Sequence, residues 1–452
     1  MKKYVLFLAV SVCCYADLAA AGEKVFVAEA FANQVKVLDA AALSAAAQEV
    51  NVGLTPRDVK LGADGKTLYV ANYGSHDLTE IDPLTLAVRR TINLSCMPSA
   101  LAISPDGSTG YALCRNIERL VYVDIPSGSE IASLRIAFPF GLAMTPDGQR
   151  AYVSRSMFSR YVDVVDLTQR KVTTSITVGR YPQGIIVGPS GRSVYTANAG
   201  SASVSIIDTA TNTVRATIAV GNGPTAVAVD SGEKFLFVAN KNDASVSVVD
   251  LEIGKTIVTI PVGVAPQALA LASADPLLYV ANFNSNTISV INTQTYQEMA
   301  AIPVGNGPQA LAVLAPTDTT PPDVSLSLSA DILWPPNHKM LPISVEIAVA
   351  DDQDPHPTIQ LVSISSNEPC SDATVATPSL KLKGANPSTC SDISDAVIGT
   401  ADDTFMLRAE RFGYSDAGRI YTITYKVTDA AGNETLATTA VQVPLNFSGS
   451  QD

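Results

Sequence analysis

"LYVANFNSNTISVINTQT", residues 278–295, decides the fold, because the chain contains the same pattern twice more at equal distances. "LFVANKNDASVSVVDLEI" begins 42 residues earlier, at Leu236, and "VYTANAGSASVSIIDTAT" begins at Val194. Each stretch joins an apolar tetrad to an alternating segment that ends near an Asp or an Asn. A period of about 42 residues is typical of a propeller or another repeat array.

Three markers recur with this period. The first is the apolar tetrad, which begins at Phe26, Tyr69, Tyr111, Tyr152, Tyr195, Phe237 and Tyr279. The second is an acidic or amide residue after the alternating segment, at Asp39, Asp82, Asp124, Asp166, Asp208, Asp250 and Asn292. The third is a proline before an apolar strand, at Pro56, Pro98, Pro139, Pro182, Pro224, Pro266 and Pro308. Three markers in step indicate seven copies of one unit.

Each unit predicts four short strands. An apolar strand such as "TAVAV" precedes a turn such as "SPDG" at 104–107, and the tetrad strand, an alternating strand and a segment such as "TIVTIPVG" follow. Runs rich in β-branched residues between turn residues are typical of strands. Four strands in about 42 residues is the length of a propeller blade. The copies therefore predict an all-β, seven-bladed β-propeller over residues 22–315.

The two ends of the array predict a closed ring. The first copy begins at Val25 without a proline strand before it, whereas the last proline strand, "PQALAV" at 308–313, has no tetrad after it. We therefore expect the last strand to be the innermost strand of the first blade. Closure of this kind removes exposed sheet edges, which otherwise promote aggregation.

The repeats "YVANYGSHDLTEID" and "GNGPTAVAVDSGEKFLFVANKNDASVSVVD" resemble the YVTN-type β-propeller repeats of secreted and cell-surface proteins in bacteria and archaea. The resemblance covers about residues 24–315 and implies a surface or extracellular protein, often of adhesion or envelope type. It brings no catalytic residue, because the motif residues are structural. In turns such as "DTATNT" at 208–213, we expect the carboxylate to accept backbone N–H groups.

The composition changes after residue 315. A linker rich in Pro and Thr at 316–322 precedes alternating segments such as "ISVEIAVA" and "IYTITYKVTD", which predict an antiparallel β-sandwich at 323–446 and a tail at 447–452. "ILWPPNHKMLPISVEIAVADDQDP" and "RAERFGYSDAGRIYTITYKVTDAAGNET" resemble an Ig-like module that many bacterial extracellular proteins carry. This resemblance implies spacing or attachment, without chemistry of its own.

The N-terminus has the pattern of a secretory signal. A basic start, "MKK", precedes the apolar run "YVLFLAVSVCC" and the motif Ala19-x-Ala21, so we expect cleavage after Ala21 to remove residues 1–21. Cys13 and Cys14 leave lipoprotein processing open as an alternative. No other apolar run approaches the roughly 20 residues of a membrane helix. The pattern predicts a secreted, periplasmic or cell-surface protein without a transmembrane segment.

The charge of the chain argues against nucleic acid as a partner. Without residues 1–21 the chain has 28 basic and 42 acidic residues, a net charge of −14. Residues 321–452 contain 17 of these acidic residues and 7 of the basic ones, so the second domain is the more acidic part.

One face of the ring departs from the repeat. Loops of an antiparallel blade alternate between two faces, so the loops after the tetrads and those before the prolines share one face. In the third and fourth copies these loops contain arginines and large aromatics, a composition enriched in binding surfaces. Arginine also suits carboxylate or phosphate groups, whereas repeat drift with arginine stems over apolar surface is the alternative. This predicted patch comprises Arg115, Arg119, Phe138, Phe140, Arg155, Phe158, Arg160, Tyr161, Arg180 and Tyr181.

Four cysteines remain after signal cleavage and predict two disulfides, as expected for an exported chain. The hairpin around "SPDGS" brings Cys114 close to Cys96 and predicts a Cys96–Cys114 disulfide. Cys370 and Cys390 are expected to close a loop of the second domain.

The second domain contains one candidate metal site. Asp351, Asp352 and Asp354 form a cluster of carboxylates that suits calcium, although a solvated acidic turn is the alternative. Trp334, the one tryptophan of the chain, is expected in the core of this domain rather than as a sugar-stacking surface.

The mouth of the channel offers little catalytic chemistry. The residues that follow the prolines are expected to ring it, and among them none is acidic or His: Arg57, Ser99, Phe140, Gln183, Thr225, Gln267 and Gln309. The chain has three histidines, His76, His338 and His356, too few and too scattered for a Ser-His-Asp set in the ring. We therefore expect no enzyme, and no cofactor besides possible calcium.

The sequence favours an exported binding protein. We expect it to recognise a protein, or an anionic glycan or other envelope component, through the loop face of the third and fourth blades. A lactonase-like or metal-dependent hydrolase that uses the channel is an alternative from another class. A purely structural scaffold is the third possibility.

Overall fold

The apolar tetrads lie in strands that are buried on both faces. In the computed structural model of this protein, every residue of β5 (Leu68–Asn72), β17 (Ser193–Asn198) and β25 (Leu277–Asn282) is buried. The structure describes residues 23–40, 48–273, 276–316, 320–351, 354, 356–368, 392–411, 418–429 and 431–445. These divide into two compact units, one ending at Pro316 and the other within the rest of the chain.

The first unit contains seven antiparallel sheets of four strands in its described part. The innermost strands are β28 (Pro308–Leu314), β4 (Pro56–Leu61), β8 (Pro98–Ile103), β12 (Pro139–Met144), β16 (Pro182–Val187), β20 (Pro224–Val229) and β24 (Pro266–Leu271). The tetrad strands come next: β1 (Lys24–Glu29), β5, β9 (Thr109–Cys114), β13 (Arg150–Arg155), β17, β21 (Phe235–Asn240) and β25. The third strands are β2 (Gln34–Asp39), β6 (Asp77–Ile81), β10 (Arg119–Asp124), β14 (Tyr161–Asp166), β18 (Ser203–Asp208), β22 (Ser245–Asp250) and β26 (Thr287–Asn292). The outer strands are β3 (Gln48–Asn51), β7 (Val88–Asn93), β11 (Ser129–Arg135), β15 (Lys171–Thr177), β19 (Thr213–Ala219), β23 (Lys255–Pro261) and β27 (Gln297–Pro303).

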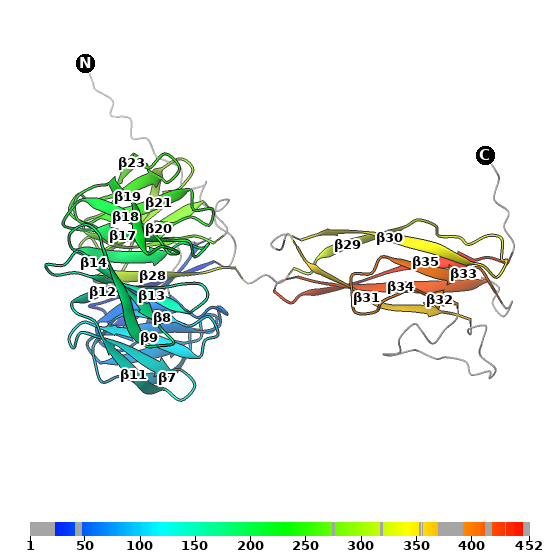
Figure 1. The fold of residues 1–452 in the computed structure, drawn as a ribbon, viewed down its shortest axis with the longest axis horizontal. Coiled ribbons are helices and arrows are strands. Elements are labelled where there is room, and N and C mark those ends of the chain that lie inside the picture. Colours follow the sequence, from blue (N-terminus) through cyan, green and yellow to red (C-terminus); the bar gives the residue numbers. More distant parts are fainter. Residues whose placement is uncertain are drawn as a thin grey trace, which may run out of the picture. The chain divides into compact units, whose positions relative to one another are not determined.

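The innermost strands form a closed circle. Each contacts the innermost strand of the next sheet, and β28 contacts both β24 and β4. As expected from the two ends of the array, β28 pairs with β1, from Lys24 opposite Leu314 to Glu29 opposite Pro308. Figure 1 shows yellow-green β28 within the body formed by the blue and green strands. This arrangement of sheets is that of a β-propeller.

The cores of the first unit lie between neighbouring sheets. Phe237 and Val248 of one sheet pack with Leu278 and Val280 of the next, and similar clusters fill the other interfaces. A tetrad strand must therefore be apolar on both faces, because each face contacts a different neighbour. This explains why the tetrad is a continuous apolar run rather than an alternating one.

The second unit contains two sheets around one core (Figure 1). The first sheet is built from β29 (Asp323–Leu328), β30 (Met340–Ala350), β33 (Thr404–Arg408) and β32 (Ile393–Ser394). The second sheet contains β31 (Thr358–Ser366), β34 (Arg419–Thr428) and β35 (Glu434–Val443). Strict alternation of buried and half-buried residues along β34 shows that one face of this sheet covers the core.

The prediction that Trp334 lies in this core is wrong. Its side chain is 41% exposed, whereas the preceding Leu333 is 2% exposed and belongs to the core. Because Leu333 takes the inward position, the next residue along the chain lies at the surface.

Candidate functional site

A bulge at the start of each innermost strand takes the residue after the proline out of the ladder. In the fourth of the sheets along the chain, Pro139 lies opposite Arg155 and Gly141 lies opposite Ser154, so Phe140 has no partner in the ladder. The same shift follows the proline in the other six sheets. A bulge redirects the side chain of the extra residue. The residue after each proline therefore leaves the ladder, and its place at the channel mouth stays a prediction.

The loops before the prolines and after the tetrads lie on one face, as the sequence predicts. The backbone N–H of Tyr73 donates to the Thr55 carbonyl (3.0 Å), and the N–H of Ser156 donates to the Phe138 carbonyl (3.0 Å). Equivalent bonds join the two loops in other sheets, such as Ala199 to Tyr181. We call this surface the loop face.

Bulky residues occupy strained positions on this loop face. The residue before the proline has a positive φ in six of the sheets, and in two of them it is glycine, Gly223 and Gly307. Phe138 and Tyr181 occupy the same position with φ of 51°. An L-residue pays about 1–2 kcal/mol for this conformation, and such strain is concentrated at functional sites. The aromatics are therefore held at a cost that glycine avoids.

Two cavities open among these loops. The larger has a volume of about 550 Å³, within the range of small-molecule sites, and is lined by Ser156, Met157, Phe158, Tyr181, Gln183, Ala199, Gly223, Thr225, Lys241 and Asn242. The smaller has a volume of about 270 Å³ and is lined by Arg57, Tyr73, Arg115, Asn116, Glu118, Phe138, Pro139, Ser156 and Met157. Because Ser156 and Met157 line both, the two cavities adjoin.

Exposed apolar side chains form the walls of the larger cavity. Phe158 is 89% exposed, Met157 is 55% exposed, and the Phe158 ring meets the Tyr181 ring edge-on at 6.3 Å between centroids. Met157 and Phe158 both have positive φ, so the loop presents two successive bulky residues in the left-handed region. Aromatic and methionine side chains held in this way are typical of binding surfaces.

Stacked guanidinium groups line the smaller cavity. Arg57 lies over the Tyr73 ring at 4.4 Å, and Arg115 lies over the Phe140 ring at 4.3 Å. Burial lowers the pKa of Arg115, and the charge of Arg57 lowers it further. The two cations are therefore close enough to repel each other.

The structure brings together only part of the predicted patch. Arg115, Phe138 and Phe140 belong to the smaller cavity or its stacking layer, and Phe158 and Tyr181 belong to the larger one. The remaining residues of the patch line neither cavity: Arg119, Arg155, Arg160, Tyr161 and Arg180.

The contacts of these outlying residues are partly structural. The Nε of Arg155 donates to the Ala137 carbonyl (2.9 Å), and its guanidinium approaches Asp163 (3.5 Å) and the Tyr161 ring (5.5 Å). Exposed Arg119 donates from Nη1 to the Ser133 hydroxyl (2.8 Å).

Sequence reasoning did not join Arg57, Tyr73 and Lys241 to the patch. Arg57 follows a proline and was expected at the channel mouth, but its copy otherwise matches the repeat and gave no reason to connect it with the third and fourth copies. The bulge at Arg57 is seen only in the structure, so the sequence contained no signal that places Arg57 beside Arg115.

The predicted Cys96–Cys114 disulfide is confirmed. Cys114 ends β9 opposite Pro98, and both cysteines are completely buried. The bond joins the loop before β8 to the end of the tetrad strand, next to Arg115. Cys370 and Cys390 lie outside the described residues, so their pairing stays a prediction.

The described part of the calcium cluster shows an acidic turn. The backbone N–H of Asp354 donates to Oδ1 of Asp351 (2.6 Å), and that of His356 donates to Oδ1 of Asp354 (2.8 Å). Asp352 lies outside the described residues, and calcium here stays a prediction. Among the residues that the structure describes, no three His, Cys, Asp or Glu side chains form a group that could hold a metal.

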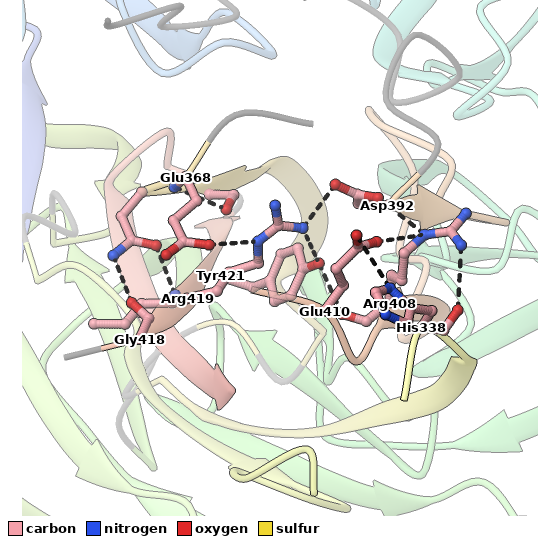
Figure 2. A network of polar contacts seen from close by, with 11 residues as sticks. His338, Glu368, Asp392, Arg408, Glu410, Gly418, Arg419 and Tyr421 are labelled. Atoms are coloured by element: carbon pink, nitrogen blue, oxygen red, sulfur yellow. Dashed lines mark hydrogen bonds and ion pairs between the residues drawn. The ribbon is translucent and has the colours of Figure 1, made fainter. Parts of the chain in front are cut away.

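A polar cluster inside the second unit was missed from the sequence. Figure 2 shows Arg419 between Glu368 and Asp392. The two ion-pair distances are 3.4 Å and 2.6 Å, and all three side chains are at most 1% exposed. Asp392 also forms an ion pair with Nε of Arg408 (2.9 Å), and Tyr421 accepts from Nη1 of Arg419 (3.0 Å). Burial opposes the charge of Arg419, but its bonds to Tyr421 and Asp392 raise the pKa overall. The cluster is internally paired, and its residues line neither of the two cavities of the loop face.

Comparison with known proteins supports the propeller fold. A family model described as a YNCE-like beta-propeller matches residues 7–134. No curated protein matches the chain. In the described residues, no helix has the length and hydropathy required to cross a membrane.

Three solved structures illustrate the fold similarity. Hydrazine synthase of Kuenenia stuttgartiensis superposes with a TM-score of 0.52 and 21% identity, over 56% of this chain and 88% of that one. A functionally unknown protein from Desulfotomaculum acetoxidans DSM 771 superposes with a TM-score of 0.59 and 15% identity, over 65% of this chain and 99% of that one. The dihydro-heme d1 dehydrogenase NirN, in complex with DHE, superposes with a TM-score of 0.53 and 14% identity, over 65% of this chain and 76% of that one. At these identities the likeness shows the fold alone.

Proposed function

We propose that this chain is an exported recognition protein that binds a component of the cell envelope or extracellular surface through the two cavities of its loop face. The observation that carries the proposal is the pair of adjoining cavities, walled by strained and exposed aromatic side chains. Loops held by a rigid scaffold are a common place for binding sites. The strain at Phe138 and Tyr181 favours a binding role over repeat drift, because glycine at this position, as in Gly223 and Gly307, would relieve it.

The architecture that we propose for this role is a seven-bladed propeller of YVTN type with an Ig-like accessory module. Seven sheets whose innermost strands contact in a circle support the blade count. Two sheets around one core support the Ig-like sandwich. In this proposal the propeller recognises the ligand, and the second unit provides spacing or attachment.

Export is proposed from the N-terminal pattern and from the cysteines. A disulfide between completely buried cysteines fits an oxidising compartment. N-terminal sequencing of the protein recovered from outside the cytoplasm tests this point. A mature chain that begins at Gly22 is the expected result, and a chain that retains residues 1–21 would contradict it.

Co-sedimentation with cell-envelope and polysaccharide fractions tests the binding role. Phe158→Ala is the informative variant, because its ring is 89% exposed and its removal should not unfold the protein. Phe31→Ala is the matched control: Phe31 is 66% exposed, makes one edge-on ring contact with Phe283, and lines neither cavity.

We expect the wild type and Phe31→Ala to pellet, and Phe158→Ala to remain largely in the supernatant. If all three pellet equally, attachment lies outside the cavities and the proposed site is wrong. If none pellets, the recognition role is wrong, and the scaffold and hydrolase alternatives gain.

A further inference from the structure

The smaller cavity contains two cations without an acidic partner. None of the ion pairs formed by the described residues includes Arg57 or Arg115. Arg57 has, in addition, a buried Nε that makes no hydrogen bond. A buried donor without an acceptor is costly and rare, so this atom indicates that an acceptor is missing from the cavity.

The two guanidinium groups are pre-positioned. Each is stacked on an aromatic ring, Arg57 on Tyr73 and Arg115 on Phe140, which fixes the plane and leaves the N–H edges available. The planar fork of arginine matches a carboxylate through two parallel hydrogen bonds. An anion between these two groups would also remove their mutual repulsion.

The carboxylate of Glu118 does not fill this role. Although Glu118 lines the smaller cavity, its oxygens approach Nη2 of Arg135 (3.5 Å) and the backbone N–H of Phe138 (3.4 Å). With Lys241 in the larger cavity, the charged residues lining the two cavities are three cations and one anion, in a chain of net charge −13. The site is locally positive in an acidic protein, which favours an anionic ligand.

The larger cavity offers a different set of contacts. The exposed Phe158 ring is an apolar platform, and Gln183 and Asn242 contribute amide groups to the lining of the same cavity. Flat apolar platforms ringed by hydrogen-bonding groups suit a sugar, which has an apolar ring face and hydroxyls at its edge. Since the two cavities adjoin at Ser156 and Met157, one ligand can reach both.

We propose that the site binds an acidic saccharide, with a uronate carboxylate held by Arg57 and Arg115 in the smaller cavity and a neighbouring sugar ring on Phe158 in the larger one. This inference rests on the proposed function and specifies the class of its ligand.

Isothermal titration of the full mature chain with tri-galacturonate tests the inference. The fully methyl-esterified trisaccharide is the matched probe, because it keeps the sugar rings and removes the charges. The variants are Arg57→Gln and Arg115→Gln, with Arg119→Gln as the control, since Arg119 belongs to the same patch but lines neither cavity.

Loss of a charged hydrogen-bonding group is expected to weaken tri-galacturonate binding about 10- to 100-fold for Arg57→Gln and for Arg115→Gln. Arg119→Gln should bind like the wild type, and the methyl ester should bind at least about tenfold more weakly than the acid. Arg115→Gln should melt no lower than the wild type without ligand, because it removes a repulsion, and this separates lost binding from lost folding.

Three results would overturn the inference. One is equal binding of the acid and its methyl ester, and another is unchanged affinity in both cavity variants. The third is that poly-L-glutamate binds with the same affinity as tri-galacturonate and with the same dependence on Arg57 and Arg115. This would show that the site binds carboxylates of a peptide. If no uronate binds while co-sedimentation still depends on Phe158, the proposed function stands and this inference alone fails.

Discussion

The two units bury polar groups in different ways. In four sheets of the first unit the last residue of the tetrad is a neutral amide: Asn240, for example, is completely buried, and its Nδ2 donates to the hydroxyls of Ser245 (3.1 Å) and Ser247 (2.9 Å). In the second unit the buried group is the charged Arg419, held by two buried carboxylates (Figure 2). The buried amide recurs in several sheets, whereas a buried arginine held by two buried carboxylates occurs once in the described residues.

The buried amide at the end of the tetrad can be replaced in one sheet without changes in the others. Asn198 and Asn282 repeat the contacts of Asn240, and Asn72 donates to the Asp77 carboxylate and the Thr79 hydroxyl. The same position is Glu29, Cys114 and Arg155 in the other sheets. The two sheets with Cys114 and Arg155 are those that contribute Arg115, Phe138 and Phe140 to the smaller cavity. Each amide contributes little and contacts only its own surroundings, so one copy can change and acquire a new role. A buried charge cannot change alone, because it leaves its partner unpaired.

The largest expected effect breaks the charged cluster. Arg419→Ala removes the cation between the buried carboxylates of Glu368 and Asp392, although Asp392 keeps its ion pair with Arg408, and should destabilise the second unit by about 3–5 kcal/mol. Urea unfolding of the full chain, followed by Trp334 fluorescence, reports on this unit, since the chain has one tryptophan.

Lys426→Ala is the control for that measurement. Lys426 pairs with Glu434 at 2.9 Å, but both side chains are substantially exposed, so its removal should cost at most about 1 kcal/mol. Equal effects of the two substitutions would show that burial does not distinguish these pairs.

The second prediction concerns the sheet in which a disulfide replaces the amide. Cys96 and Cys114 are 18 residues apart, and a bridge over a loop of this length stabilises by about 3 kcal/mol. Replacing both cysteines by Ala should lower the unfolding midpoint of the first unit. Circular dichroism measures this midpoint. The Trp334 transition should stay unchanged. The prediction would be contradicted if the wild type had the same unfolding midpoint as the variant and if dithiothreitol did not change the midpoint of the wild type.

The sequence predicts the elements that repeat better than those that occur once. The strands, the pairing of β28 with β1 and the turn carboxylates follow from comparing copies of one unit, and the Cys96–Cys114 bond follows from the register of one hairpin. Arg419 lies in the segment "GRIYTITYKV", where a buried arginine at a strand start has no periodic signature. Arg57 was predicted at the channel mouth, which stays a prediction, and its proximity to Arg115 depends on bulges and stacking that no spacing encodes.

The third prediction tests the regular sheets through a glycine. A Cβ built on Gly221 would lie 2.6 Å from Cγ of Asn240, so Gly221→Ala should displace the amide and destabilise the first unit by about 1–3 kcal/mol. The two sheets that have Cys114 and Arg155 in place of Asn also lack this glycine. They have Ser95 and Ala137 at the equivalent position, so the glycine occurs together with the amide.

Gly232→Ala is the control for the glycine, since a Cβ there meets nothing within 4 Å. This substitution should be neutral or stabilise by up to about 1 kcal/mol, because alanine restricts the unfolded chain. Chemical denaturation gives both values, and a tolerated Gly221→Ala would show that the amide does not need the glycine.

The smallest expected effect concerns the turns opposite the loop face, where copies differ by one ionisable group. The backbone N–H and the hydroxyl of Thr211 hold the pKa of Asp208 below its ordinary value, whereas Asn292 accepts the equivalent N–H bonds from Gln294 (2.9 Å) and Thr295 (2.8 Å) and cannot titrate. A lowered folded-state pKa means that the turn contributes stability above about pH 4, and this contribution is lost as the pH falls toward the folded pKa. Asp208→Asn should therefore fold normally at neutral pH, as the copy with Asn292 indicates, and should lose less stability than the wild type between about pH 5 and 3. Melting temperatures of the two proteins across this range decide the matter: parallel curves would mean that the carboxylate acts only as a hydrogen-bond acceptor, for which its charge is irrelevant.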